Sequence, residues 1–107
     1  MKARSSVQSK ACDISAKVKA IVWERDKHRC VVCWSNNAFP NAHALLSRAH
    51  GGRGIEQNVV TLCQECHRKY DQGTKQEHDL IYEIIIKYMQ KQYKGLKISD
   101  VIYQKRT

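Results

Sequence analysis

The sequence predicts a small α+β domain that is closed around a bound zinc ion. Two Cys-x-x-Cys pairs, Cys30/Cys33 and Cys63/Cys66, are separated by residues 34–62. Short apolar segments adjoin both pairs, and a longer segment with helical spacing follows the second pair. A single domain of 107 residues has room for only a modest core, so a metal held by four cysteines would supply needed stability.

The cysteine spacing favours one structural metal site. Four thiolates in two such pairs suit a tetrahedral Zn²⁺. Four buried free thiols are the alternative interpretation. A redox Cys-x-x-Cys is less favoured, because no βαβ pattern surrounds either pair. Cys12 lies outside the pattern and has no assignable partner.

The charge of the chain favours a polyanionic partner. Lys and Arg number 19 against 10 Asp and Glu, giving a net charge of +9. Nucleic acid is the commonest partner of so basic a domain, although a generic soluble surface is the alternative. Residues 1–10 carry charge with no apolar run behind them, and nothing resembles a membrane helix. We therefore expect a soluble, cytoplasmic protein in a reducing compartment.

The first half of the chain alternates short elements with turns. Residues 1–12 are polar, and we expect them to be flexible. Apolar residues at helical spacing predict a helix from Asp13, as N-cap, to about Arg25. The first cysteine pair should form a zinc-knuckle hairpin turning at 35–37, followed by a short strand over 42–46.

The second half is predicted to be helical. A helix should begin near Gln64 and end at Gln72-Gly73, and a longer one should cover 75–93. Six residues form one apolar stripe on this long helix, which we expect to pack against the first helix: Leu80, Ile81, Ile84, Ile85, Tyr88 and Met89. The tail from Lys97 carries apolar residues that would dock back on the domain.

The segment around the cysteines resembles the HNH endonucleases. The resemblance covers about 18–73 and is especially close to small phage and prophage members. The residues that carry it are Cys30-x2-Cys33, His43, Ser47, Gly51-Gly52, Asn58 and Leu62-Cys63-x2-Cys66-His67. It implies a ββα-metal (treble-clef-like) core over 14–73, flanked by an N-terminal helix and a C-terminal helical extension at 75–107. The whole chain would then be one HNH domain.

The resemblance also implies a reaction. HNH enzymes cleave DNA phosphodiesters, by nicking or double-strand cutting, and leave a 5′ phosphate and a 3′ hydroxyl. By position, His43 and His67 match the two ligands of a catalytic Mg²⁺, Mn²⁺ or Ni²⁺, and Asn58 matches the residue that braces the loop. Likeness to phage members suggests terminase components as partners. A non-catalytic zinc-finger module that binds nucleic acid is the alternative.

One position departs from the family pattern. The residue after the first metal ligand is normally the general-base His, and here it is Ala44. The order of Leu45, Leu46, Ser47 and Gly51-Gly52 supports this register. Alanine cannot accept a proton, so the pattern predicts impaired catalysis. His50 could substitute, but it lies well beyond position 44 in a glycine-rich loop.

Two further predictions concern charged residues. Asp71 lies one helical turn beyond His67 and is a candidate third ligand, although an exposed acidic residue is the simpler interpretation. Basic residues near the expected metal should neutralise DNA phosphates. They are Arg25, Lys27, Arg29, Arg48, Arg53, Arg68 and Lys69.

Overall fold

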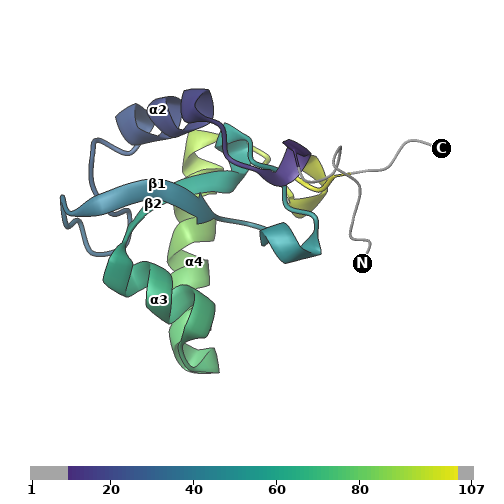
Figure 1. The fold of residues 1–107 in the computed structure, drawn as a ribbon. Helices are drawn as coiled ribbons and strands as arrows, with labels where there is room; N and C mark the ends of the chain where they lie inside the picture. Colours follow the sequence, from purple (N-terminus) through teal and green to yellow (C-terminus); the bar gives the residue numbers. More distant parts are fainter. Residues whose placement is uncertain (1–9, 104–107) are drawn as a thin grey trace, which may run out of the picture.

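The computed structural model of the protein describes residues 10–103. Its main elements are α2 (Ala16–Arg25), β1 (Ala38–His43), β2 (Val59–Cys63), α3 (Gln64–Gln72) and α4 (Lys75–Gln92), with 3₁₀ turns η1 (Arg48–His50), η2 (Glu56–Asn58) and η3 (Ile98–Asp100) (Figure 1). The predicted α+β class is confirmed. Most of the stretch expected to be flexible lies outside the described residues, whereas Cys12 is buried.

The sheet is a two-stranded antiparallel ribbon of β1 and β2. Ala38 pairs with Cys63 and His43 with Val59, and the register shifts between Phe39 and Ala42. Pro40 lies at that shift, where its missing N–H costs no ladder bond. The prediction of a strand at 42–46 was therefore placed too late along the chain.

The first cysteine pair forms turns and not the expected hairpin. Cys30 N–H donates to the Ser35 carbonyl at 2.8 Å, and Trp34 N–H donates to the Cys30 carbonyl at 2.9 Å. Trp34 has a positive φ of 71°. These bonds close the backbone on itself, so it cannot pair as a strand.

Capping side chains set where the helices begin. Ser15, not Asp13, caps α2, because its Oγ accepts from the Val18 N–H at 3.2 Å. Thr74 and Glu77 form a reciprocal capping box at the start of α4. The two helices after the second cysteine pair therefore begin and end close to the predicted positions.

The hydrophobic core lies between the sheet and α4. Ile81, Ile85 and Met89 are buried in one cluster with Val60 and Leu62. The predicted packing of this stripe against the first helix was wrong for these buried residues, although Tyr88 reaches the end of α2, where its hydroxyl donates to the Asp26 carboxylate at 2.6 Å. α2 packs on the strands, and α4 crosses behind them (Figure 1), with α3 beside it. Leu80, predicted to be part of the stripe, is 62% exposed.

The C-terminal tail docks against the glycine-rich loop. Arg53 N–H donates to the Val101 carbonyl at 2.8 Å, and Tyr103 N–H donates to the Gly51 carbonyl at 2.7 Å. Gly52 and Ile102 form an isolated antiparallel bridge between these contacts. The tail thus fixes a loop that is far away in sequence. None of the helices in 10–103 is long and apolar enough to cross a membrane.

Candidate functional site

The four cysteines come together as the spacing predicted. Their Sγ atoms all lie within 4.8 Å of one another, and those of Cys33 and Cys63 are 3.5 Å apart. A tetrahedral zinc with bonds of about 2.3 Å separates its sulfurs by roughly 3.8 Å. Cys30, Cys63 and Cys66 are buried, and Cys33 is exposed at the edge. The donor set and its geometry fit a zinc ion.

Backbone N–H groups point at these sulfurs. Val32 and Cys33 N–H donate to Cys30 Sγ at 3.4 and 3.5 Å, and Cys66 N–H donates to Cys63 Sγ at 3.4 Å. Burial opposes ionisation of Cys30, but these donors hold its pKa below the ordinary value. Such donors stabilise the thiolates that a metal requires.

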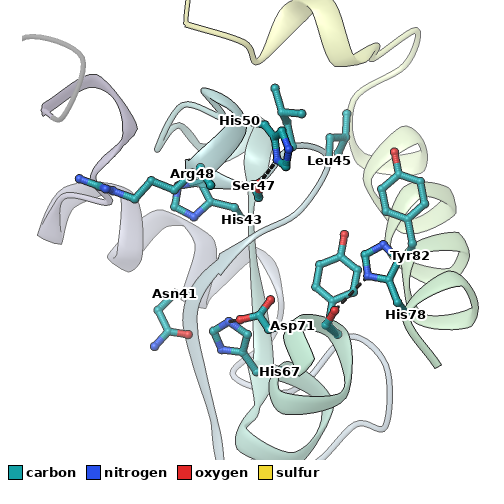
Figure 2. Close-up of a pocket in the computed structure, with 13 residues that line it drawn as sticks. Asn41, His43, Leu45, Ser47, Arg48, His50, His67, Asp71, His78 and Tyr82 are labelled. Carbon is teal, nitrogen blue, oxygen red and sulfur yellow. Dashed lines mark hydrogen bonds and ion pairs between the residues drawn. The ribbon is translucent and has the colours of Figure 1, made fainter. Parts of the chain in front are cut away.

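A cleft of about 570 Å³ collects residues from four parts of the fold (Figure 2). β1 contributes His43, the η1 segment contributes His50, and α3 and α4 contribute the opposite side. Its lining residues are Asn41, His43, Leu45, Leu46, Ser47, Arg48, Ala49, His50, His67, Tyr70, Asp71, His78 and Tyr82. The two histidines predicted to hold a cation therefore share one cleft.

His43 is oriented by the segment that precedes α2. Its Nε2 lies 2.8 Å from the Cys12 carbonyl oxygen. Because a carbonyl only accepts, Nε2 carries the proton and Nδ1 of the neutral ring carries a lone pair. Burial lowers the pKa of His43, which favours the neutral ring. A histidine that donates one ring N–H to a backbone carbonyl is in the form that ligates metals.

His67 and Asp71 form a pair on one face of α3. His67 Nε2 lies 3.1 Å from Asp71 Oδ2, and their side chains are 31% and 57% exposed. The negative charge of Asp71 also raises the pKa of His43, although burial of the ring has the larger effect and lowers that pKa. Within residues 10–103, only the four cysteines come together closely enough to form a ready metal cluster. His43, His67 and Asp71 share the cleft without being gathered at coordination distance.

Asn58 ties together the loop that follows β1. Its Oδ1 accepts from Leu45 and Leu46 N–H at 2.8 and 3.1 Å. Its Nδ2 donates to the carbonyls of Leu46 and Arg53, each at 3.0 Å. Gly52 makes room for this arrangement, since a Cβ there would lie 1.8 Å from the Leu46 carbonyl oxygen. These bonds fix the backbone directly after His43.

Ala44 lies beneath the cleft and not in it. It is 1% exposed and is not among the lining residues. Its N–H donates to the Asn58 carbonyl at 2.7 Å, and its carbonyl accepts from the Tyr70 hydroxyl at 2.8 Å. His43 therefore lines the cleft, whereas Ala44, directly after the end of β1, is buried in the core cluster.

Among the basic residues, Arg25 does not lie where the sequence interpretation placed it. Its guanidinium donates to the Asp26 carboxylate and to the carbonyls of Glu56 and Val59, and its side chain is only 10% exposed. It is therefore not available to a DNA phosphate, which argues against the DNA contact that the sequence predicted for it. Its sequence neighbourhood gave no sign of burial, because the partners lie 31 and 34 residues away.

The other basic residues lie closer to the surface. Arg48 lines the cleft and pairs with Asp13. Arg68 and Lys69 both lie near Glu65, at 2.9 and 3.7 Å. Arg29 lies over the Trp34 ring at 5.0 Å, and Lys27 and Arg53 are exposed.

The cleft contains residues that the sequence interpretation set aside. His50 lines it, and its Nδ1 lies 2.7 Å from Ser47 Oγ. Tyr70, His78 and Tyr82 form another part of the lining. His78 and Tyr82 are spaced i, i+4 on α4, which is a signal that they share one face. Nothing in the sequence showed that this face meets the cleft.

Comparison with known proteins identifies the class. Residues 30–73 match the HNH endonuclease family. The chain belongs to that family, as the cysteines, His43 and Asn58 predicted, so its function is of nuclease type with a metal site. Anaredoxin from Nostoc sp. (strain PCC 7120 / SAG 25.82 / UTEX 2576) is 39% identical over 57 residues, a segment that covers 53% of this chain and 75% of that protein. No solved structure matches the chain.

Proposed function

We propose that this protein is a divalent-cation-dependent DNA endonuclease. The observation that carries the proposal is that His43 from β1 and His67 from α3 line one cleft, and that His67 directly follows Cys66 of the four-cysteine cluster. Both are imidazoles on rigid elements, and Asp71 accompanies them. The proposed substrate is a DNA phosphodiester, cleaved to a 5′ phosphate and a 3′ hydroxyl.

In this proposal, His43 and His67 hold a Mg²⁺, Mn²⁺ or Ni²⁺ ion, and Asp71 serves as a third ligand. A cation bound there would neutralise charge on the phosphate and on the departing oxygen. The lone pair on His43 Nδ1 supports its role, because its Nε2 is already engaged with the Cys12 carbonyl. His67 would have to turn from Asp71 or share it with the cation.

Asn58 is proposed as a positioning residue. Its four hydrogen bonds hold the chain at Leu45, Leu46 and Arg53, so the backbone after His43 cannot drift from the cleft. The structural zinc is proposed to act in the same way on α3. It anchors Cys66, which directly precedes His67.

We propose that hydrolysis is impaired. No imidazole occupies position 44, and a positioned general base contributes on the order of 10²–10⁴-fold in rate. His50 is the remaining cleft imidazole near the loop, and its contact with Ser47 orients it. Weak activity would therefore depend on His50 or on hydroxide from solution.

The proposed binding to DNA rests on the positive charge of the protein. The net charge of +9 and the exposed residues Lys27 and Arg53 support attraction to phosphates, and Arg48 lies in the cleft itself. A cytoplasmic location in a bacterial host, and action beside phage terminase components, follow only from the likeness to phage members and remain proposals.

A second candidate is a non-catalytic zinc module that binds nucleic acid. The observation that favours it is the burial of Ala44, since the position of the family's base points into the core. Both functions predict salt-sensitive DNA binding. The two functions predict different metal contents, because only an endonuclease would bind a further cation between His43 and His67.

Plasmid nicking tests the proposal. Zinc-loaded protein is incubated with supercoiled plasmid and Mg²⁺, Mn²⁺ or Ni²⁺, alongside His43→Ala, His67→Ala and the control His28→Ala. His28 stacks on Trp23, outside the cleft. Cation-dependent nicking that falls at least tenfold in the first two variants and persists in the third supports an endonuclease. Equal nicking by all four proteins would mean a contaminating nuclease.

The proposed base defect has its own test, the variant Ala44→His. Because Ala44 is buried, folding is first checked by circular dichroism. A gain in nicking would place the family's base at position 44. A folded variant that nicks no faster than the wild type would contradict that assignment. DNA binding without nicking by either protein would favour the zinc module.

A further inference from the structure

The cleft has an aromatic part that the proposed metal chemistry does not use. Tyr70 and His78 stack with ring centroids 4.7 Å apart and planes inclined by 6°. Tyr82 lies almost parallel to both, at 6.4 Å from Tyr70 and 6.0 Å from His78. Figure 2 shows His78 and Tyr82 on α4, across the cleft from His43 and His50. We call Tyr70, His78 and Tyr82 the aromatic wall.

Hydrogen bonds hold two members of the aromatic wall in place. The Tyr70 hydroxyl donates to the Ala44 carbonyl at 2.8 Å. His78 Nδ1 donates to the Tyr70 carbonyl at 2.9 Å, which leaves Nε2 of the neutral ring as an acceptor. The Tyr70 and His78 rings therefore have fixed orientations, and they lose little conformational freedom when a flat ligand stacks on the wall.

Contacts between α3 and α4 account for the positions of Tyr70 and, in part, of His78. They do not account for the position of Tyr82. The Tyr82 hydroxyl makes no hydrogen bond to residues 10–103, and its ring is partly exposed at the cleft. His78 is exposed as well. These parallel rings are partly exposed in a cleft that also contains Arg48, which Figure 2 shows on the opposite side from His78 and Tyr82.

We propose that the aromatic wall stacks an unpaired nucleobase, so that the cleft receives single-stranded or locally opened DNA. This inference rests on the proposed function and names its substrate class. Bases in a duplex stack on one another and present only their edges, whereas an unpaired base offers its face to an aromatic ring. Arg48 and the histidines opposite would then meet the backbone of the same strand.

If the aromatic wall stacks a base, loss of a ring should affect binding of single-stranded and duplex DNA differently, whereas loss of a phosphate contact should affect both. Loss of a stacking ring weakens single-strand binding by about 5–100-fold in other proteins. Duplex binding, which depends on phosphates, should hardly change. The unpaired base must contribute to binding as well. Removing that base from the strand should therefore weaken single-strand binding as much as removing the Tyr82 ring.

The experiment measures fluorescence anisotropy with zinc-loaded, full-length protein and no added divalent cation. The probes are a labelled single strand, the same strand in a duplex, and the strand with one abasic position moved along it. The test variant is Tyr82→Leu, and Tyr82→Phe keeps the ring. Phe39→Leu is the matched control, because it removes a ring that is 49% exposed elsewhere on the surface.

We expect Tyr82→Leu to weaken single-strand binding at least fivefold and duplex binding less than twofold, with Tyr82→Phe and Phe39→Leu close to the wild type. One abasic position should abolish the difference between the wild type and Tyr82→Leu. Equal losses on both DNA forms, or no loss, would overturn the inference and leave the proposed function standing. A wild type that binds neither form would overturn both.

Discussion

Replacement of Asn58 by alanine should destabilise the domain strongly, because one side chain satisfies four backbone groups. Each hydrogen bond contributes about 0.5–1.5 kcal/mol, so the four together are worth roughly 2–6 kcal/mol. Leu45 N–H is buried and cannot regain a water partner, whereas the Arg53 carbonyl belongs to an exposed residue. We expect the free energy of unfolding to fall by about 3 kcal/mol.

Urea unfolding of the zinc-saturated protein, followed by circular dichroism, measures this change. The melting temperature should fall by roughly 10 °C as well. Asn41→Ala is the matched control, because Asn41 is exposed on β1 and its side chain makes no hydrogen bond to residues 10–103. We expect it to change stability by less than about 0.5 kcal/mol. A loss below about 1 kcal/mol for Asn58→Ala would refute the bracing role, since the four bonds together are worth at least about 2 kcal/mol.

Three further predictions concern other parts of the fold. Thr61→Val should leave stability unchanged or raise it by about 1 kcal/mol in urea unfolding, because the buried Thr61 Oγ1 has no hydrogen-bond partner within residues 10–103; a clear loss would contradict this. Arg25→Ala should lower stability by about 3 kcal/mol, because the buried Asp26 carboxylate would lose its cation and keep, in the described part of the chain, only the Thr61 N–H and the Tyr88 hydroxyl as donors; an unaltered unfolding curve with weaker DNA binding would restore the role of Arg25 as a DNA contact. Removal of zinc by a chelator should abolish the helical circular dichroism signal reversibly, whereas a metal-free protein with unchanged signal would refute the structural role of the cysteines.

The sequence was most informative where it contained a metal-binding motif or a local helical pattern. The cysteine spacing predicted the metal cluster, and caps and apolar periodicity predicted α3 and α4 to within a residue or so. Asn58 could be assigned a bracing position only through the family resemblance. Its four bonds reach residues 5–13 positions away, which no local pattern records.

Two shortcomings of the sequence interpretation have the same cause, which is long-range contact. Arg25 is surrounded by charged residues in the sequence, yet it is buried because Asp26 and two distant carbonyls receive it. The aromatic wall was missed because Tyr70 and His78 meet only after the chain turns between α3 and α4. The strand before the cleft begins earlier than predicted, at Ala38, and includes Pro40, which a strand tolerates at an irregular register.

Ala44 shows that the register of a sequence match does not determine where a side chain points. The spacing to the glycine pair assigns it to the base, but Ala44 is buried in the core cluster and does not line the cleft. A match in sequence order therefore identifies a position without giving its orientation.

The central claim, that two imidazoles from different elements serve one cation, is tested most directly by Mn²⁺ titration of the zinc-loaded protein. The imidazole NMR signals of all five histidines are followed as Mn²⁺ is added. The account predicts that His43 and His67 broaden first and together, while His28, which lies in the turn after α2 and outside the cleft, stays sharp. Uniform broadening, or broadening of only one of the two, would contradict it.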